Sequence, residues 1–156
     1  MKTAVILDSE LNSTHPMEAV LDRRGFLVLR AGTTEEAIMT LKSAGAPVDL
    51  VIIEVPLSGR TLQTEAPVKI HGAFADVPLL LISDLPLDHW PEDDFQQFGQ
   101  LLSGRIDLLV KPLSQASFMS KVNSLIYTVS YRESRRLFES AATSRRELAR
   151  VSPQAP

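Results

Sequence analysis

The stretch "VDLVIIEVPLSG", residues 48–59, indicates what kind of sheet this chain forms. From Leu50 to Ile53 its residues are all apolar, without the polar alternation of a half-exposed strand. Such a run is typical of a strand that is buried on both faces of a parallel sheet. One carboxylate, Glu54, follows the run directly. Because open parallel sheets bind ligands beyond the carboxyl ends of their strands, Glu54 is the first candidate for a functional residue.

Four more apolar runs of the same character occur along the chain. They are "AVIL" at 4–7, "FLVL" at 26–29, "PLLLIS" at 78–83 and "DLLV" at 107–110. Helix signals separate the first three runs: Ser13 and Thr14 can cap one helix, with Pro16 in its first turn. Thr33 and Glu36 form a capping-box pattern ahead of the next helix. This alternation predicts a doubly wound α/β fold with a five-stranded parallel sheet.

The third and fourth connections are less regular than the first two. The third contains Pro67 and Gly72, so any helix there should be short or broken, because proline lacks an amide donor and clashes with the preceding turn. The fourth begins as a loop around Trp90, which either covers the core or anchors a partner. A helix should follow from about Glu92 to Leu102, since its acidic first turn suits the helix dipole.

The composition fits one globular domain with an appendage. The chain has 156 residues, of which 44% are apolar, enough for a single hydrophobic core. It has no cysteine, which excludes a disulfide framework, a zinc–thiolate site and a thiol nucleophile. No apolar run approaches the roughly 20 residues of a membrane span, and Asp8 comes too early for a signal peptide. We therefore expect a cytoplasmic protein with no membrane partner.

The C-terminal part predicts long helices. Residues 113–152 contain neither glycine nor proline, and helical spacing of apolar residues continues to Val129. We therefore divide the chain into a domain, residues 1–129, and a helical extension with a frayed tail, residues 130–156. If helical, residues 130–150 would project roughly 30 Å. A 4-3-4 spacing in the extension predicts a short coiled-coil seam for a homodimer, formed by Leu137, Ala141, Ser144 and Leu148.

The charge pattern also separates the two parts. Residues 1–129 carry a net charge of −6, whereas residues 130–156 carry six arginines and three glutamates, a net of +3. The glutamates are interspersed, no set of aromatic residues accompanies the arginines, and no helix-turn-helix follows. The pattern does not favour binding to nucleic acid, and we expect a protein partner.

Polar residues follow four of the five predicted strands. Because the carboxyl ends of parallel strands meet at one edge of the sheet, we expect these residues to lie together. They are Asp8, Ser9 and Glu10 after the first run, Glu54 after the third, Ser83 after the fourth, and Lys111 with Pro112 after the fifth.

These segments resemble the receiver domains of two-component response regulators. The residues that carry the resemblance are "ILDSE", "DLVIIEVPLSG", "LLLIS" and "DLLVKPLS", of which the last is the most specific. The resemblance covers residues 1–129 and implies a flavodoxin-like (CheY-like) fold. It implies that Asp8 and Ser9 match the paired acids that help to hold Mg²⁺, and that Glu54 matches the phosphoacceptor aspartate. Ser83 and Lys111 match the hydroxyl and the lysine that bind the phosphoryl group, with a cis peptide after the lysine.

Two positions depart from the family's pattern. Ser9 replaces a carboxylate, and a hydroxyl is a poor ligand for Mg²⁺. Glu54 is one methylene longer than aspartate, which misplaces it as an in-line nucleophile. Glu10 can supply a compensating carboxylate only if the first strand continues that far. We therefore expect an atypical receiver, a pseudo-receiver, without a catalytic residue or cofactor and with weak metal affinity at most, at Asp8, Glu10 and Glu54.

A physical role for Glu54 follows from its neighbours. Its carboxylate should reach Lys111 and Ser83 directly and occupy the place of a phosphate, which would fix the domain in one state. The output would then pass through protein contacts. The candidate contact residues are Trp90, Leu108 at the position of the family's switch aromatic, Leu137, Ala141 and Leu148.

Two alternatives remain open. The first is a conventional receiver that is phosphorylated in a phosphorelay despite Glu54 and Ser9. The second is a phosphatase that resembles the haloacid dehalogenases, with Asp8 as its nucleophile beside Ser83 and Lys111. The sequence lacks the later acidic pair and the cap domain of such enzymes.

Overall fold

The computed structural model describes residues 1–8, 15–58, 61–62, 64–101, 105–127 and 131–151. A five-stranded sheet with the order β2-β1-β3-β6-β7 forms its centre, and all neighbouring strands are parallel. The strands are β1 (Thr3–Leu7), β2 (Leu27–Ala31), β3 (Leu50–Val55), β6 (Leu79–Ser83) and β7 (Ile106–Val110). Each predicted apolar run forms one of them, and the order confirms the flavodoxin-like fold.

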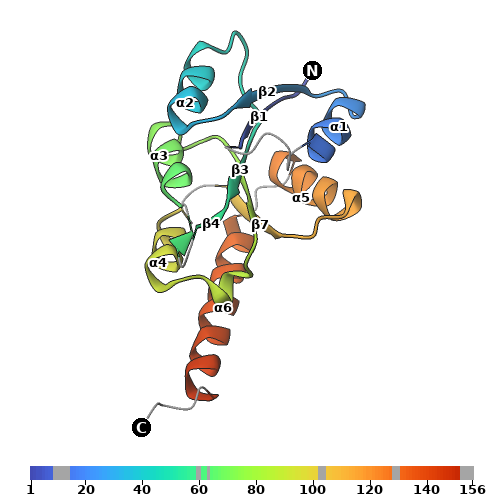
Figure 1. Cartoon of the computed structure of the whole chain (residues 1–156). Coiled ribbons are helices and arrows are strands. Elements are labelled where there is room, and N and C mark those ends of the chain that lie inside the picture. The colour runs from blue at the N-terminus through green and yellow to red at the C-terminus, as the bar shows by residue number, and fades with distance from the viewer. Residues whose placement is uncertain (9–14, 59–60, 63, 102–104, 128–130, 152–156) are drawn as a thin grey trace.

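Helices cover both faces of the sheet (Figure 1). α1 (His15–Arg23) and α5 (Gln115–Tyr127) bury their apolar residues against one face. α2 (Thr34–Ser43), α3 (Glu65–Ala73) and α4 (Glu92–Gln100) cover the other face. Among the described helices, none combines the length and the apolarity needed to cross a membrane.

Local sequence signals explain how several helices begin and end. Thr33 Oγ1 caps α2 by accepting the amide of Glu36 at 3.1 Å, and the Glu36 carboxylate accepts the amide of Gly32 at 2.8 Å. Gly25 follows α1 with a φ of 85°, which costs little without a Cβ atom. Pro67 is the third residue of the short helix α3, where an amide has no intrahelical acceptor to lose. The predicted caps Ser13 and Thr14 lie outside the described residues.

Two features between β3 and α4 were not predicted. β4 (Leu57–Ser58) and β5 (Thr61–Leu62) pair antiparallel, and strands this short leave no periodic pattern in a sequence. In the acidic first turn of α4, Asp94 is buried and accepts a hydrogen bond from the Thr64 hydroxyl at 2.8 Å. α4 ends at Gln100, close to the predicted end.

The C-terminal helix α6 (Tyr131–Val151) differs from the predicted projecting helix, because part of it packs on the domain. Phe138 stacks on Phe95 of α4, with ring centroids 4.7 Å apart and planes 10° apart. Gly99 permits this close approach, since a Cβ atom there would lie 3.1 Å from the Phe138 ring. Ala141 is buried in the same cluster. At Ala141, the apolar side of α6 that was predicted to form a coiled-coil seam therefore packs against the same chain.

Polar contacts also fix α6 to the segment that precedes α4. Ser144 donates a hydrogen bond of 2.8 Å to Asp88 in the short helix η1 (Leu87–His89). Arg145 donates to the backbone carbonyl of Trp90 and, at 2.7 Å, to the Glu92 carboxylate. Its guanidinium also lies 4.3 Å from the centroid of the Phe95 ring. Residues 137–145 therefore make a specific contact with the domain.

The remainder of α6 runs past the body of the domain (Figure 1). Residues 146–150 are exposed, and Leu148 is 43% exposed. The two edge strands of the sheet differ in burial. β2 is largely accessible, whereas four of the five residues of β7, on the side where α6 packs, are buried.

Replacement of Arg145 tests the attachment of α6. Arg145→Ala should lower the free energy of unfolding by about 1–3 kcal/mol, because it removes two hydrogen bonds and the contact with the Phe95 ring. Urea unfolding followed by far-UV circular dichroism measures the change. The matched control is Arg146→Ala, whose exposed side chain bonds, among the described residues, to Thr143 in α6 itself. Equal stability of both variants would contradict the described contact.

Candidate functional site

The carboxyl ends of the strands bring most of the predicted site residues to one edge of the sheet. Asp8 follows β1, Ser83 ends β6, Lys111 follows β7 and Glu54 is the second-last residue of β3. The Asp8 amide donates to the Ala31 carbonyl, and the Lys111 amide to the Ser83 carbonyl, both at 3.0 Å. These hydrogen bonds continue the pairing of the strands to the carboxyl edge of the sheet. They fix the backbone of Asp8 and Lys111 there. Ser9 and Glu10 lie outside the described residues.

The main interaction at this edge is an ion pair between Glu54 and Lys111. Lys111 Nζ donates to Glu54 Oε1, as expected from the sequence, and the side chain of Glu54 is only 9% exposed. Burial by itself lowers the pKa of Lys111, but the hydrogen bond and the charge of Glu54, helped by Asp84, outweigh it and raise this pKa above its ordinary value. Lys111 is therefore held in its charged form.

Asp84 is a site residue that the sequence reasoning missed. Its Oδ1 lies 3.5 Å from Lys111 Nζ, so Lys111 faces two carboxylates. The signal was its place directly after Ser83 in "LISD", at the carboxyl end of a predicted strand. An acidic residue at that place belongs to the same edge of the sheet as Glu54 and Lys111.

Ser83 takes part in a different set of hydrogen bonds from the one expected. It is fully buried, and its hydroxyl donates to the Leu85 carbonyl at 2.8 Å. The same oxygen accepts from the Leu85 amide at 3.1 Å and from Trp90 Nε1 at 3.2 Å. Because a hydroxyl has one hydrogen to donate, Ser83 does not donate to Glu54 in this arrangement. It instead ties the site to the loop that precedes α4.

Trp90 covers the core, which is one of the two roles that the sequence left open. It is 2% exposed, its indole N–H also donates to the Leu85 carbonyl at 3.0 Å, and its ring meets Phe98 edge to face at 5.7 Å. Leu108 is likewise buried, in the cluster to which α6 contributes. Of the five predicted contact residues, Leu148 is exposed, while Trp90, Leu108, Leu137 and Ala141 pack within the chain. The peptide between Lys111 and Pro112 is cis, as the resemblance implies.

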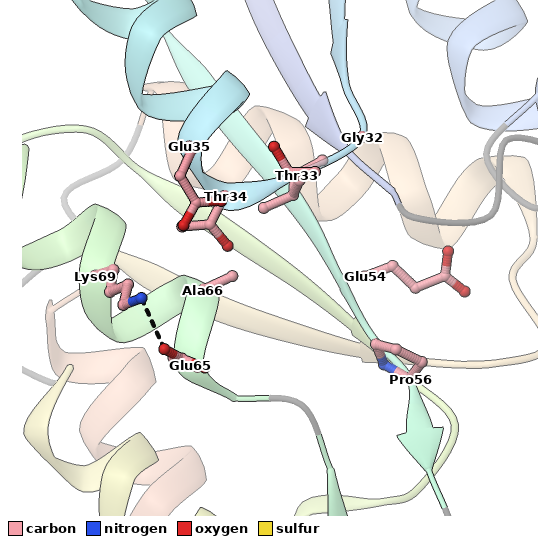
Figure 2. Close-up of a pocket in the computed structure, with 10 residues that line it drawn as sticks. Gly32, Thr33, Thr34, Glu35, Glu54, Pro56, Glu65, Ala66 and Lys69 are labelled. Carbon is pink, nitrogen blue, oxygen red and sulfur yellow. Dashed lines mark ion pairs between the residues drawn. The ribbon is translucent and has the colours of Figure 1, made fainter.

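A pocket of about 530 Å³ opens beside the site, between the loops that follow β2 and β3. Figure 2 shows that the Glu54 carboxylate points away from Lys69 and Glu65, which form their own ion pair at 2.7 Å. The described lining also includes Glu35, and of its three carboxylates Glu65 is paired with the lining's Lys69 and Glu54 with Lys111. An anionic ligand would therefore meet an unfavourable potential in this pocket.

The described residues do not form a set that fits Mg²⁺. Within the part of the chain that the structure describes, no three acidic or histidine side chains lie close enough together to hold a metal. Asp8 and Glu54 provide two carboxylates, but that of Glu54 is bonded to Lys111. Mg²⁺ requires nearly octahedral oxygen ligation, and an ammonium group on a carboxylate opposes it.

Solved structures of response regulator receiver domains share this fold. A two-component response regulator from Clostridium difficile is 22% identical, with a TM-score of 0.64 over 82% of this chain and 98% of that chain. A response regulator from Thermotoga maritima, solved with Mg²⁺-BeF, is 21% identical, with a TM-score of 0.61 over 80% of this chain and 99% of that one.

A chain of the CheX-CheY-BeF3-Mg²⁺ complex from Borrelia burgdorferi is 20% identical, with a TM-score of 0.63 over 80% and 88% of the two chains. No family model and no curated protein matches the sequence. At these identities the likeness shows the fold, and the roles of individual residues rest on the geometry described above.

Replacement of Glu54 tests the cause of the raised pKa of Lys111. In Glu54→Gln this pKa should fall, because burial remains while the opposite charge is lost. Since the folded pKa of Lys111 is raised, its contribution to stability is complete below the ordinary value of 10.5 and is lost as pH rises through the raised value. The variant should lose this contribution at all lower pH values.

The reactivity of Lys111 toward an acylating reagent, followed by peptide mass spectrometry over a range of pH, measures the shift. Glu65→Gln is the matched control, because it removes the partner of Lys69 and leaves Lys111 unchanged. An unchanged reactivity of Lys111 in Glu54→Gln would rule out the ion pair as the cause.

Proposed function

We propose that this chain is a receiver-type signalling module that binds protein partners and does not accept a phosphoryl group at Glu54. The ion pair between Glu54 Oε1 and Lys111 Nζ supports this proposal most directly. It places a carboxylate on the lysine whose counterpart in receivers, by the resemblance, binds the phosphoryl group. Glu54 thus acts as a built-in anion.

The local charge favours the same conclusion. A phosphoryl group that approached Lys111 would have to compete with Glu54, which is attached to the sheet, and with Asp84 at 3.5 Å. Two like charges at such distances oppose a third, most strongly where burial limits screening. The anion that the chain supplies itself is therefore favoured over one from solution.

Geometry also argues against Glu54 as a nucleophile. Phosphoryl transfer depends on positioning of the attacking oxygen in line with the leaving group. The hydrogen bond to Lys111 directs one oxygen of Glu54 to the ammonium group, and the hydroxyl of Ser83 is committed to Leu85. Both groups are thus engaged within the chain itself.

The role that remains is recognition of proteins. The Borrelia burgdorferi structure is a complex of CheX with CheY, so a protein complex is known that includes a chain of this fold. The fixed pair at Glu54 would hold this chain in one conformational state, in which it binds its partner without a phosphorylation step. We propose that the chain transmits a signal simply by being present, or by assembling with other protein chains.

Incubation with acetyl phosphate and Mg²⁺ tests the proposal. The intact mass of the chain should not increase by one phosphoryl group, because Lys111 is already paired with Glu54. The comparison is the Ser9→Asp, Glu54→Asp double variant. It has the shorter acceptor and the second acid that the resemblance to receiver domains implies at these two positions. We expect this variant to gain a phosphoryl group on residue 54.

A phosphoryl group on the unaltered chain would contradict the proposal and favour the conventional receiver. Turnover of a generic phosphate ester that is abolished by Asp8→Asn would contradict it in favour of the phosphatase. Both measurements use the same protein preparation. One set of experiments therefore distinguishes the proposed module from the conventional receiver and from the phosphatase.

A further inference from the structure

A second polar cavity lies beside the edge strand β7, distinct from the carboxyl edge that holds Glu54. It measures about 360 Å³ and opens between β7, α5 and α6. We propose that it binds a phosphate group, either the free ion or that of a small phosphomonoester, and that the bound group ties α6 to α5. This site does not depend on the proposed function. Its described lining consists of Asp107, Ser120, Lys121, Ser124, Arg136 and Leu137.

Asp107 is a buried acid that interrupts the apolar run of β7. Its side chain is only 5% exposed. Its Oδ1 accepts the amide of Leu108 at 2.7 Å, and its Oδ2 accepts Lys121 Nζ at 2.9 Å. Burial of a carboxylate with an ammonium group costs free energy, and an apolar pair of similar size would often be as stable. Asp107 therefore serves to hold Lys121 in place at the cavity.

Lys121 keeps donors for a ligand. An ammonium group has three hydrogens to donate, and the bond to Asp107 uses one of them. The side chain of Lys121 is 38% exposed, so its charge is accessible from the cavity. Ser120 and Ser124 are four residues apart on α5, and this spacing places both on the same side of the helix. One helix thus supplies an ammonium group and two hydroxyls.

Arg136 supplies a second cation from α6. It is exposed, and within the part of the chain that the structure describes it makes no ion pair. A guanidinium group presents its N–H donors as a planar fork, which matches two oxygens of a phosphate. The next residue, Leu137, packs against the core cluster and so holds this turn of α6 beside the cavity.

The charge of the lining favours an anion. Lys121 and Arg136 carry two positive charges and Asp107 one negative charge, which gives a net charge of +1. The pocket beside Glu54 differs, because Glu35 there adds a carboxylate to two ion pairs. The donors of the cavity come from two helices, and a tetrahedral phosphate has oxygens that point in several directions. A phosphate therefore suits these donors better than a planar carboxylate does.

A phosphate in this cavity would contact both helices at once. α6 is attached to the domain through residues 137–145, and Arg136 directly precedes them. A ligand that binds Lys121 and Arg136 together requires α6 to be docked, so its binding stabilises the docked helix by mass action. The concentration of a small phosphorylated molecule would then control how firmly α6 is attached.

Nuclear magnetic resonance of the isotope-labelled full chain tests the site. Titration with inorganic phosphate, and separately with phenyl phosphate, at constant ionic strength should shift the amide signals of Ser120, Lys121 and Ser124 until they saturate. Tighter binding of phenyl phosphate would identify an ester as the ligand, and tighter binding of inorganic phosphate the free ion. No saturable shift with either probe, or shifts at Glu54 and Lys111 in place of those on α5, would overturn the proposal.

Arg136→Gln tests whether the lining causes the binding. The affinity for the tighter probe should fall at least about tenfold, because hydrogen bonds from a charged group are lost. Arg136→Lys keeps the charge without the planar fork and should bind with intermediate affinity. Arg136 is preferred to Lys121 for this substitution, since loss of Lys121 would leave Asp107 buried without its cation and destabilise the fold.

Arg146→Gln is the matched control, because it removes an exposed arginine of the same helix and leaves the lining unchanged. Arg146 lies ten residues after Arg136, roughly 15 Å along α6, which exceeds the Debye length of about 8 Å at physiological ionic strength. It should keep the affinity of the unaltered chain. Equal losses in Arg136→Gln and Arg146→Gln, or no loss in Arg136→Gln, would refute the site, and circular dichroism without phosphate checks that both variants fold.

Discussion

Burial of both faces of the parallel sheet is the constraint from which the rest of this structure follows. The strands are continuously apolar, so neither face can be left in contact with water. α1 and α5 cover one face, and α2, α3 and α4 cover most of the other. α6 completes this second face beside β7, where the buried side chains would otherwise be exposed at the sheet's edge. The C-terminal helix is therefore a part of the core.

The same parallel arrangement brings charged groups to one edge of the sheet. Glu54, Asp84 and Lys111 come from three neighbouring strands or the residues just after them, and no local turn could place them together. Their contact depends on the register of β3, β6 and β7. A shift of β3 by a single residue would turn the side chain of Glu54 away from Lys111, because successive side chains of a strand point to opposite faces. The ion pair is thus a consequence of the core's packing.

The sequence was sufficient to predict the sheet and the pairing of Glu54 with Lys111, because periodicity and strand ends determine both. It was insufficient for Ser83, whose hydroxyl turns toward Leu85 and Trp90. A hydroxyl has several acceptors within reach, and only the three-dimensional arrangement decides among them. The docking of α6 was missed for a related reason. An apolar stripe shows that a helix must pack, but does not show whether its partner belongs to the same chain.

Trp90 has a further consequence for the study of this chain. It is the only tryptophan, and its indole contacts Ser83 at the site while its backbone carbonyl accepts from Arg145 of α6. Tryptophan emission depends on the polarity and the hydrogen bonds around the indole. The tryptophan fluorescence of the unlabelled chain therefore comes from one buried position between the ion pair and the C-terminal helix. It offers an optical signal for rearrangement at either end, in a protein that needs no added probe.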